Sequence, residues 1–526
     1  MDYDVIVIGS GFGGAITSCR LAEKKKRVLV LERGKKWTKT TYPRKLEDDW
    51  IWSNTHPEEF HGWTDLRRFK GMAVIAGAGV GGGSLIYANV SAVPPESVFQ
   101  SGWPPEITLQ ALQTYYDTVA KVLDIQTVPE KQWSPRVRLM KEAATNLNQA
   151  QRFRPASIAV SFDPNLKYDF STPPNPANSK PFINKHGAQQ GTCAHLGECD
   201  IGCPVEAKNT LEKNYLFIAE KNGAEIRPLH LVTNIEPIPG GYRVHHSELK
   251  DGGSVAGSTT AERVILAAGS MGSTELLLRC RDVSKTLPSL SPFLGKHWSS
   301  NGDFLTPAFY LHRDIWPDWG PTIGAVIDYL DASDNGQTYW IQDGGIPNVM
   351  NKYSQAVVER LRKAPHETHL LEGFNMQSLI QHVTLLSSDL DVFKRIMPWF
   401  AQGVDAGDGD LHLTEGNLDL TWNIAASLPL FDTIEQRHHK LADATGGHPF
   451  PLPTWLLSQE LVTPHPLGGC NMGRSAAEGV VNHAGEVFGY KNLYVADGAI
   501  IPRPLGVNPS RTISALAERI ADKMPV

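Results

Sequence analysis

Three absences narrow the class of protein before any motif is read. No apolar stretch approaches the roughly 20 residues that a membrane-spanning helix needs, and no basic and then apolar leader precedes the first apolar run. Six cysteines in 526 residues are too few for a disulfide framework. We therefore expect a protein of the reducing cytoplasm without a membrane span.

An excess of basic charge is also lacking. The 50 Lys and Arg residues face 56 Asp and Glu residues, which gives a formal net charge of −6. This balance offers no electrostatic surface for nucleic acid or anionic lipid, so we expect a small-molecule partner. The remaining composition is that of an ordinary globular protein, and its length predicts either two joined domains or one α/β domain with a large insertion.

What the sequence does have is a dinucleotide-binding signature near its N-terminus. Residues 4–34 read DVIVIGSGFGGAITSCRLAEKKKRVLVLERG, a pattern typical of a strand, a glycine turn, a helix and a second strand. Gly9, Gly11 and Gly14 fit GxGxxG, in which glycines let the backbone approach a pyrophosphate at a helix N-terminus. Glu32 ends the second strand, where a carboxylate accepts hydrogen bonds from the adenosine ribose. This signature alone does not separate nicotinamide from flavin cofactors.

Four further segments make the pattern more specific. They read GMAVIAGAGVGGGSLIYANV at 71–90, AERVILAAGSMGSTELLLR at 261–279, TPHPLGGCNMGR at 463–474 and NLYVADGAIIPRPLGVNPSRTISALAERIADKM at 492–524. Together with the N-terminal turn, they resemble the glucose/methanol/choline (GMC) family of FAD oxidoreductases, and within it the cholesterol-oxidase-like branch. The resemblance covers the FAD scaffold and is weaker over residues 96–190 and 290–460.

The resemblance implies an α/β fold with FAD as the cofactor. A discontinuous Rossmann-type FAD-binding domain would be assembled from residues 1–95, 191–290 and 461–526. An α+β substrate-binding domain on an antiparallel sheet would be inserted at 291–460, with 96–190 as a lid or connecting segment. The cofactor-binding residues so implied are Gly9, Gly11, Phe12, Gly13, Gly14, Glu32, Gly79, Gly82, Gly83, Ser84, Val232, Ala268, Gly269, Asp497, Gly498 and Pro509. Asp497 lies beside a glycine, so its carboxylate also suits local turn chemistry.

Two residues suit the oxidation of an alcohol to a carbonyl by hydride transfer to flavin N5. His465, in HPLGGC, matches the family histidine that faces the flavin, and its ordinary pKa near 6.5 lets it accept the hydroxyl proton. Asn508 would orient the hydroxyl. It also reads as a helix N-cap followed by Pro509 at the first helical position, and the two roles are compatible. A structural histidine in a proline-flanked loop is the alternative for His465.

The substrate side departs from the cholesterol-oxidase pattern. Gln342 stands where the family glutamate that isomerises the enone would be, with Asp343 next to it, and Gln342 cannot abstract a proton. We interpret both as candidate substrate residues and doubt a sterol substrate. Tyr87 stands where the family commonly presents an asparagine to the flavin, with Asn89 two residues on. The tryptophans suit an apolar or ring-containing alcohol.

A cysteine run raises the question of a metal centre. Residues 193–204 read CAHLGECDIGCP, so Cys193, Cys199 and Cys203 match the bacterial ferredoxin run with Leu196 in place of one ligand. This spacing predicts a possible [3Fe-4S] cluster and with it an electron-transfer protein as acceptor. The alternatives are a zinc site completed by His195, a disulfide, or no metal.

Three functions stay open at this point. The first is an alcohol dehydrogenase or oxidase whose electron acceptor is a carrier or oxygen. The second is a non-redox flavin-dependent lyase or decarboxylase on the same scaffold, and the third is a protein that keeps FAD only as a structural ligand.

Overall fold

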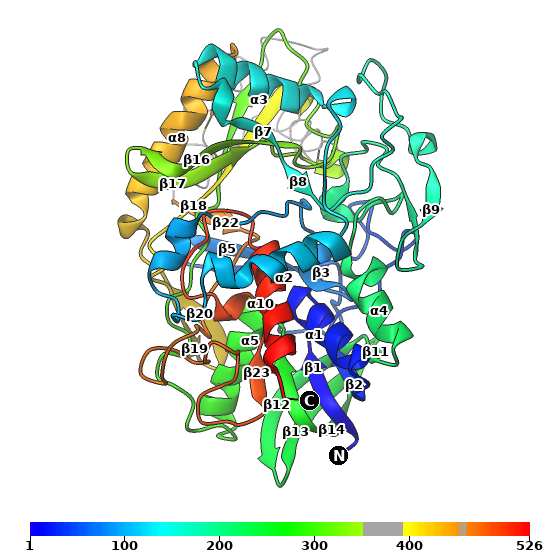
Figure 1. Cartoon of the computed structure of the whole chain (residues 1–526), viewed down its shortest axis with the longest axis vertical. Coiled ribbons are helices and arrows are strands. Elements are labelled where there is room, and N and C mark those ends of the chain that lie inside the picture. Colours follow the sequence, from blue (N-terminus) through cyan, green and yellow to red (C-terminus); the bar gives the residue numbers. More distant parts are fainter. Residues whose placement is uncertain (351–392, 451, 453–454, 456–458, 526) are drawn as a thin grey trace, which may run out of the picture.

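A seven-stranded sheet forms the lower half of the molecule (Figure 1). The structure is a computed structural model that describes every residue except 351–392, 451, 453–454, 456–458 and 526. The sheet's strand order is β11 (Glu225–Arg227), β2 (Val28–Leu31), β1 (Tyr3–Ile8), β14 (Gly253–Leu266), β13 (Gly241–Lys250) and β12 (His230–Ile238), and β23 (Leu493–Val495) also pairs with β14. The strands from β11 to β14, and β23, run parallel, whereas β12 and β13 continue the sheet antiparallel.

The strand, helix, strand unit predicted at the N-terminus is present. Val5–Ile8 and all of β2 are buried, and helix α1 (Phe12–Glu23) crosses between them. α1 packs against α10 (Ser510–Lys523) and α4 (Tyr215–Lys221), so chain segments from the start, middle and end of the sequence share one core. The Rossmann-type α/β prediction is confirmed by this arrangement.

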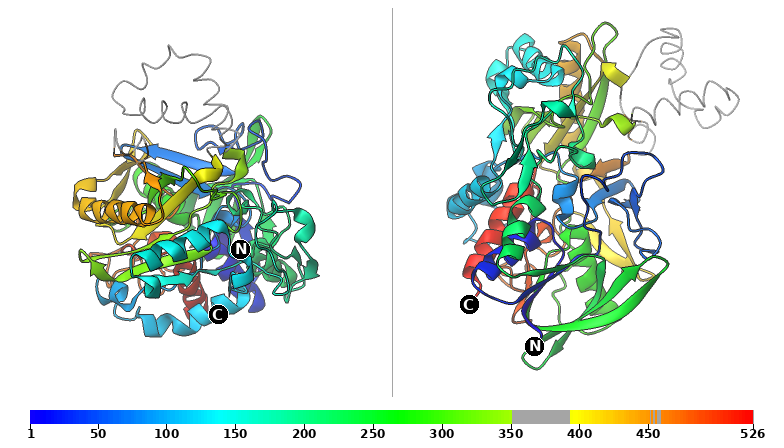
Figure 2. Two further views of the ribbon diagram at one scale, coloured as in Figure 1. Left: turned by 90° about the horizontal axis from the view of Figure 1, so that it is seen from above. Right: turned by 90° about the vertical axis from the view of Figure 1, so that its right-hand side faces the viewer.

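A second, antiparallel sheet forms the upper layer, as the right-hand view of Figure 2 shows. Its order is β21 (His448–Pro449), β15 (Phe304–Phe309), β18 (Ile396–Gly403), β17 (Gln337–Gln342), β16 (Ala325–Asp334) and β7 (Phe153–Pro155). Helices α3 (Pro135–Asn146) and α8 (Leu428–Asp443) pack against it. Segment 96–190, expected as a lid or connection, therefore supplies an edge strand and a helix to this layer.

A smaller four-stranded sheet joins the two layers. Its strands are β22 (Leu461–Thr463), β5 (Met72–Gly77), β4 (Thr64–Phe69) and β3 (Ile51–Trp52), in that order. β22 pairs in parallel with β5, so the segment that leads to His465 lies beside the strand that leads into the second glycine loop. This pairing brings two of the sequence motifs together.

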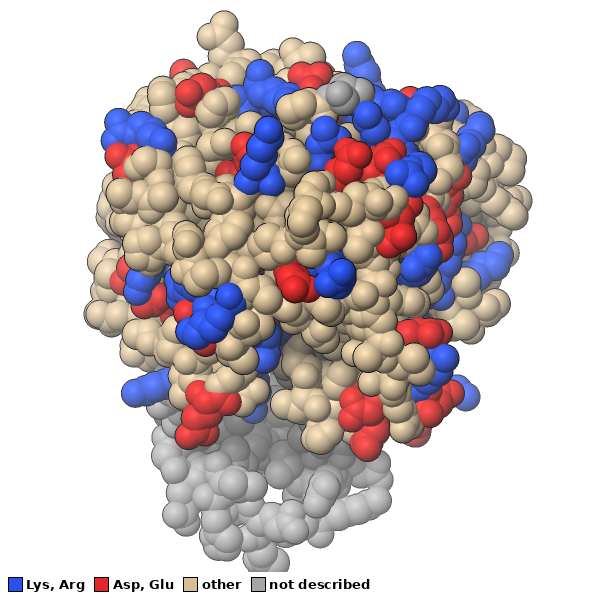
Figure 3. All heavy atoms as spheres, turned by 90° about the horizontal axis from the view of Figure 1, so that it is seen from below, with Lys and Arg blue, Asp and Glu red and all other residues tan. Residues whose placement is uncertain are grey.

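The remaining elements are short or peripheral. Helix α2 (Leu109–Val122) packs on α10, and α5 (Gly269–Leu278) follows β14. The minor strands are β6 (Gln126–Thr127), β8 (Ser157–Ile158), β9 (Pro181–Ile183), β10 (Gln189–Gly191), β19 (Asp410–Thr414) and β20 (Asn417–Thr421). Among the described residues, no helix combines the length and apolar character needed to cross a membrane. Basic and acidic side chains are intermixed on the face shown in Figure 3.

Candidate active site

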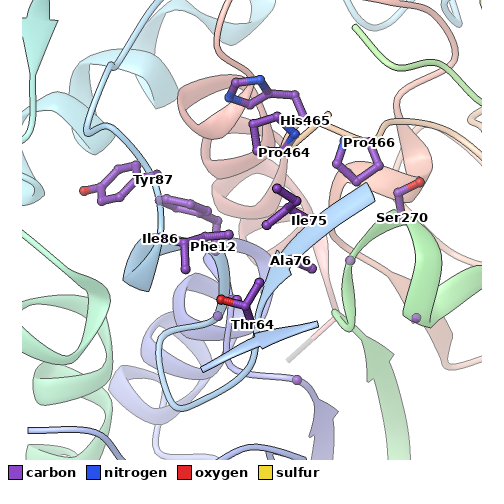
Figure 4. A pocket seen from close by; sticks show the side chains of 18 of the residues that line it. Phe12, Thr64, Ile75, Ala76, Ile86, Tyr87, Ser270, Pro464, His465 and Pro466 are labelled. Atoms are coloured by element: carbon purple, nitrogen blue, oxygen red, sulfur yellow. The ribbon is translucent and has the colours of Figure 1, made fainter. Parts of the chain in front are cut away.

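One cavity of about 780 Å³ runs between the layers and collects most of the predicted site residues. Those that line it are His465, Asn508, Gly9, Gly11, Phe12, Gly13, Glu32, Gly82, Gly83, Val232, Ala268, Gly269, Asp497, Gly498 and Pro509. In Figure 4 the side chains of His465, Pro464, Phe12, Ile75, Ile86 and Tyr87 surround the cavity. The cavity therefore joins the nucleotide-binding signature to the expected catalytic pair.

The glycines of the first turn fall into two groups. A Cβ on Gly13 would lie 2.0 Å from the carbonyl oxygen of Ala496, and one on Gly14 would lie 2.0 Å from that of Gly9. These two glycines are needed for backbone packing within the protein. A Cβ on Gly11 would meet no protein atom closer than 3.9 Å, and one on Gly83 none closer than 3.8 Å.

Gly11 and Gly83 thus have room for a Cβ in ordinary van der Waals contact, on two separate loops. Both line the cavity, and a side chain at either position would fill it rather than clash with the fold. A gap of this kind beside a helix N-terminus fits a ligand whose phosphates approach the backbone closely. The structure therefore offers a cradle for the pyrophosphate of a dinucleotide.

Three of the predicted cofactor residues do not line the cavity. Gly14 packs on Gly9, and a Cβ on Gly79 would lie 2.4 Å from the Trp37 ring. The Ser84 hydroxyl donates to the Gly81 carbonyl (2.7 Å) and accepts from the Leu211 backbone N–H (3.1 Å). Their contacts support the loops that form the cradle, and their role as cofactor residues stays a prediction.

Two carboxylates that line the cavity accept hydrogen bonds from the loops around the cradle. The Glu32 carboxylate accepts hydrogen bonds from the backbone N–H of Ser10 (3.0 Å), from its hydroxyl (2.6 Å) and from the backbone N–H of Gly34 (2.9 Å). The Asp497 carboxylate accepts from the backbone N–H of Gly269 (2.8 Å) and the hydroxyl of Ser273 (2.6 Å). Burial raises the pKa of Asp497. Asp497 thereby connects the C-terminal segment to the start of α5.

His465 is held by a buried aspartate that the sequence did not indicate. Its Nδ1 lies 2.9 Å from both carboxylate oxygens of Asp303, whose side chain is 0% exposed against 14% for His465. Oγ1 of Thr463 lies 2.6 Å from Oδ2 of Asp303 and accepts from the His465 backbone N–H (2.9 Å). Burial raises the pKa of Asp303, and the neighbouring His465 opposes that rise. Nε2, the other ring nitrogen, lies 3.4 Å from Nδ2 of Asn508.

Asn508 is placed beside His465 and Gln342 rather than at a helix cap. Nε2 of Gln342 donates to Oδ1 of Asn508 (2.5 Å). The N-cap of α10 is Pro509, without a side-chain cap, because its carbonyl accepts the first helical bond from Ile513 (3.0 Å). The predicted N-cap was therefore wrong by one residue, and the Asn508 side chain is left for the site. Gln342 is buried, and its Oε1 has no hydrogen-bond partner among the described residues.

One short segment, Ser299–Asp303, supports both catalytic candidates. Its first residue pairs through the backbone with Leu467, two residues after His465. Asn301 donates to the Val507 carbonyl (2.9 Å), next to Asn508. Buried Asp405 accepts from the hydroxyls of Ser299 and Ser300 (2.7 Å each) and fixes the segment itself. The antiparallel layer thus positions residues that belong to the C-terminal segment.

Asp343, the second candidate substrate residue, is engaged within the fold. Its carboxylate accepts from the backbone N–H groups of Gly324 (2.7 Å) and Ala325 (2.9 Å) and pairs with Arg136 (3.2 Å). Both partners of this ion pair are 0% exposed. The residue is outside the cavity lining, and burial raises its pKa to about 6.

The cysteine run does not form a metal site in the part of the chain that the structure describes. No three or more His, Cys, Asp or Glu side chains there are arranged to hold a metal ion, and Cys193, Cys199 and Cys203 are free thiols. Nε2 of His195 lies 3.0 Å from Oε1 of Gln132, and burial lowers its pKa to about 4. The predicted [3Fe-4S] cluster and its zinc alternative are therefore not supported, because folding uses this segment for packing.

Aromatic residues cover part of the cavity. Trp50, Trp52 and Trp63 line it, whereas Trp316 and Trp319 stack on one another outside it, with ring centroids 4.0 Å apart. Tyr87 also lines the cavity, and its hydroxyl donates to the Asn209 carbonyl (2.9 Å). Only the first group of tryptophans meets the expectation of an aromatic wall.

Comparison with known proteins identifies the family. Residues 442–517 match the GMC oxidoreductase family model, and residues 7–69 match the model of the NAD(P)-binding Rossmann-like domain. Over its full length the chain is 31% identical to a relative of which it covers 94%. The chain therefore belongs to the GMC oxidoreductase family, a family of FAD enzymes.

The relatives can now be named. The 31% identical protein is a cholesterol oxidase of Acinetobacter baumannii. A long-chain-alcohol oxidase of Arabidopsis thaliana is 25% identical, over 99% of this chain and 67% of its own length. A formate oxidase variant of Aspergillus oryzae has the same fold, with a TM-score of 0.64 at 13% identity over 99% of this chain and 97% of that one.

The residues present fit FAD. The open glycines 11 and 83 leave room for its pyrophosphate, and the Glu32 carboxylate ends β2 on the same cavity. His465 and Asn508 line the other part of that cavity, where the redox-active ring of a dinucleotide bound in the cradle would lie.

Proposed function

We propose that the protein oxidises an apolar alcohol to a carbonyl compound, with His465 as the base and Asn508 as the residue that orients the hydroxyl. The single observation that carries this proposal is the position of His465 and Asn508 on the wall of the same cavity as the open glycine cradle. The named alcohol oxidases among the relatives support the reaction class.

FAD, when bound, supplies the acceptor for the hydride that leaves the alcohol carbon. The chain's own residues handle the proton. Nε2 of His465 accepts the hydroxyl proton, because its Nδ1 is already engaged by Asp303. An amide of Asn508, steered by Gln342, holds the hydroxyl oxygen so that the C–H bond and the base are aligned.

The cavity wall favours an apolar substrate. Leu305, Ile323, Ile346, Pro398 and Phe400 line the cavity, and the Phe400 ring lies 6.4 Å from the His465 ring. Removal of apolar surface from water contributes about 25 cal/mol per Å², so these side chains supply binding energy that is independent of the reacting hydroxyl. Gln342 lacks the proton-accepting group that isomerisation of an enone needs, and we propose oxidation without isomerisation.

We propose oxygen as the electron acceptor. The relatives named above are oxidases, and in the described residues the cysteine run offers no cluster that would pass electrons to a carrier.

The test is an anaerobic titration of the FAD-loaded enzyme with a panel of apolar alcohols. Loss of the oxidised flavin absorption with one of these alcohols, and its return with hydrogen peroxide formation when air is admitted, is the expected result. A flavin that stays oxidised while substrate is consumed would establish a lyase or decarboxylase instead. Reduction that oxygen does not reverse would overturn the choice of acceptor alone.

A further inference from the structure

The buried contact between His465 and Asp303 indicates how the base itself is oriented. We propose that Asp303 is a positioning residue that keeps the proton of neutral His465 on Nδ1, leaves Nε2 bare for the substrate hydroxyl, and balances the imidazolium formed when that proton is taken up. The proposal deepens the function above and rests on it for its kinetic part only.

Three donors converge on the Asp303 carboxylate. Nδ1 of His465 lies 2.9 Å from both of its oxygens, and Oγ1 of Thr463 lies 2.6 Å from one of them. Gln402 is the third, and its hydrogen bond lowers the pKa of Asp303. An ionised carboxylate accepts hydrogen bonds only, so a carboxylate surrounded in this way requires a hydrogen on Nδ1.

Gln402 presents its amide nitrogen to the same pair. Its Oε1 accepts from the indole N–H of Trp340 (2.7 Å), and both groups are buried. Its Nε2, 3.2 Å from His465 Nδ1, is therefore a donor. With the proton of His465 on Nδ1, this amide donates to the Asp303 carboxylate, and that hydrogen bond lowers the pKa of Asp303.

The surroundings of the pair are otherwise uncharged. Thr463, Gln402 and Asn508 are neutral, and Asp405 is occupied with the serines of the same loop. Among the residues that the structure describes, no other charged side chain is hydrogen-bonded to His465 or Asp303. Within the described part of the chain, the Asp303 carboxylate is therefore the counter-charge hydrogen-bonded to this imidazole.

The first experiment is independent of turnover. Histidine selectively labelled with ¹⁵N reports which ring nitrogen carries the proton, and His465→Gln identifies the signal of His465. In the FAD-loaded wild-type protein at neutral pH we expect a protonated Nδ1 and an unprotonated Nε2. A proton on Nε2 of neutral His465 would overturn the proposal whether or not any alcohol is oxidised.

The second experiment uses Asp303→Asn, with Asp334→Asn as a matched control. Asp334 is also a largely buried carboxylate, bonded to Tyr339 and Arg437, away from the cavity. In Asp303→Asn we expect neutral His465 to lose its preference for the Nδ1 proton in the ¹⁵N spectrum, and the rate of anaerobic flavin reduction by alcohol to fall by about 100-fold. The control should keep the wild-type values.

An unchanged His465 tautomer in folded Asp303→Asn, measured by NMR, would overturn the proposal. A changed tautomer with no flavin reduction even in the wild type would instead refute the proposed function and leave the role of Asp303 intact. If Asp303→Asn fails to fold, the wild-type tautomer measurement still decides the question.

Discussion

Asn301 offers the sharpest test of how the site is held, because it does not line the cavity. Its side chain is fully buried. Nδ2 donates to the Val507 carbonyl (2.9 Å), and Oδ1 accepts from the backbone N–H groups of Leu505 (2.9 Å) and Gly506 (3.1 Å). This one amide therefore fixes the loop that carries Asn508.

The size of the effect depends on which groups lose their partner. Asn301→Ala would leave three buried backbone groups unpaired at about 1–3 kcal/mol each, a loss comparable to the whole stability of a typical domain. We expect this variant to misfold. Asn301→Asp keeps the acceptor for both N–H groups and loses only the donor to Val507, which costs about 1–3 kcal/mol.

The informative variant is therefore Asn301→Asp, assayed by the anaerobic rate of flavin reduction with alcohol per bound flavin. We expect near-normal FAD content, because Asn301 does not line the cavity. The rate should fall by about 10- to 100-fold, because a small displacement of Asn508 misaligns the hydroxyl.

Asn184 provides a control with a similar pattern of bonds. Its Oδ1 accepts from the backbone N–H groups of His186 (2.9 Å) and Ala188 (3.0 Å), and its Nδ2 donates to the Lys213 carbonyl (2.8 Å) and to Oε1 of Gln190 (2.7 Å). It lies outside the cavity, so Asn184→Asp should lose stability but not rate. A wild-type rate in Asn301→Asp would refute the idea that this amide holds the catalytic loop.

Three further predictions concern the cradle, the amide pair and acid stability. Gly11→Ala should fold but retain at least about tenfold less FAD, whereas Gly13→Ala should not fold, because its Cβ would lie 2.0 Å from the Ala496 carbonyl oxygen. Circular dichroism measures folding and the flavin content measures FAD binding. Full FAD retention in Gly11→Ala would contradict the cradle. Gln342→Glu places an acceptor against Oδ1 of Asn508 and should slow flavin reduction by about 10- to 100-fold, equivalent to about 1–3 kcal/mol, so an unchanged rate would argue against a fixed amide pair. Burial lowers the pKa of His438 from 6.5 to about 3. Between these two pH values the unfolded chain therefore binds more protons than the folded chain. The free energy of unfolding should then fall by about 2 kcal/mol from pH 7 to pH 5. Urea unfolding of the wild type and of His438→Gln at both pH values measures this fall. An equal pH dependence in both proteins would contradict the role of His438.

Local signals accounted for most of the fold and part of the site. The glycine turn between β1 and α1 was predicted correctly, because a buried strand, its turn and the next helix are adjacent in sequence. The antiparallel sheet of the inserted layer followed from the family resemblance. Residues 351–392 of the predicted segment 291–460 lie outside the described residues.

Long-range contacts explain what was missed. Asp303 meets His465 across 162 positions, and no periodicity or spacing in either segment points to the other. The N-cap at Asn508 failed for a related reason, because the amide is engaged by Gln342, 166 positions away. The cysteine run matched a ligand spacing, but spacing alone does not make the three thiols converge.

The pairing of β22 with β5, of β23 with β14 and of α10 with α1 has a consequence for folding kinetics. Each contact joins the segment 461–525 to a much earlier part of the chain, and contacts of such large sequence separation slow folding. During synthesis the N-terminal β1–α1–β2 unit must wait for this segment before its sheet and core are complete. We therefore expect the nascent chain to expose apolar surface until then and to depend on chaperones more than a protein of similar size with local contacts.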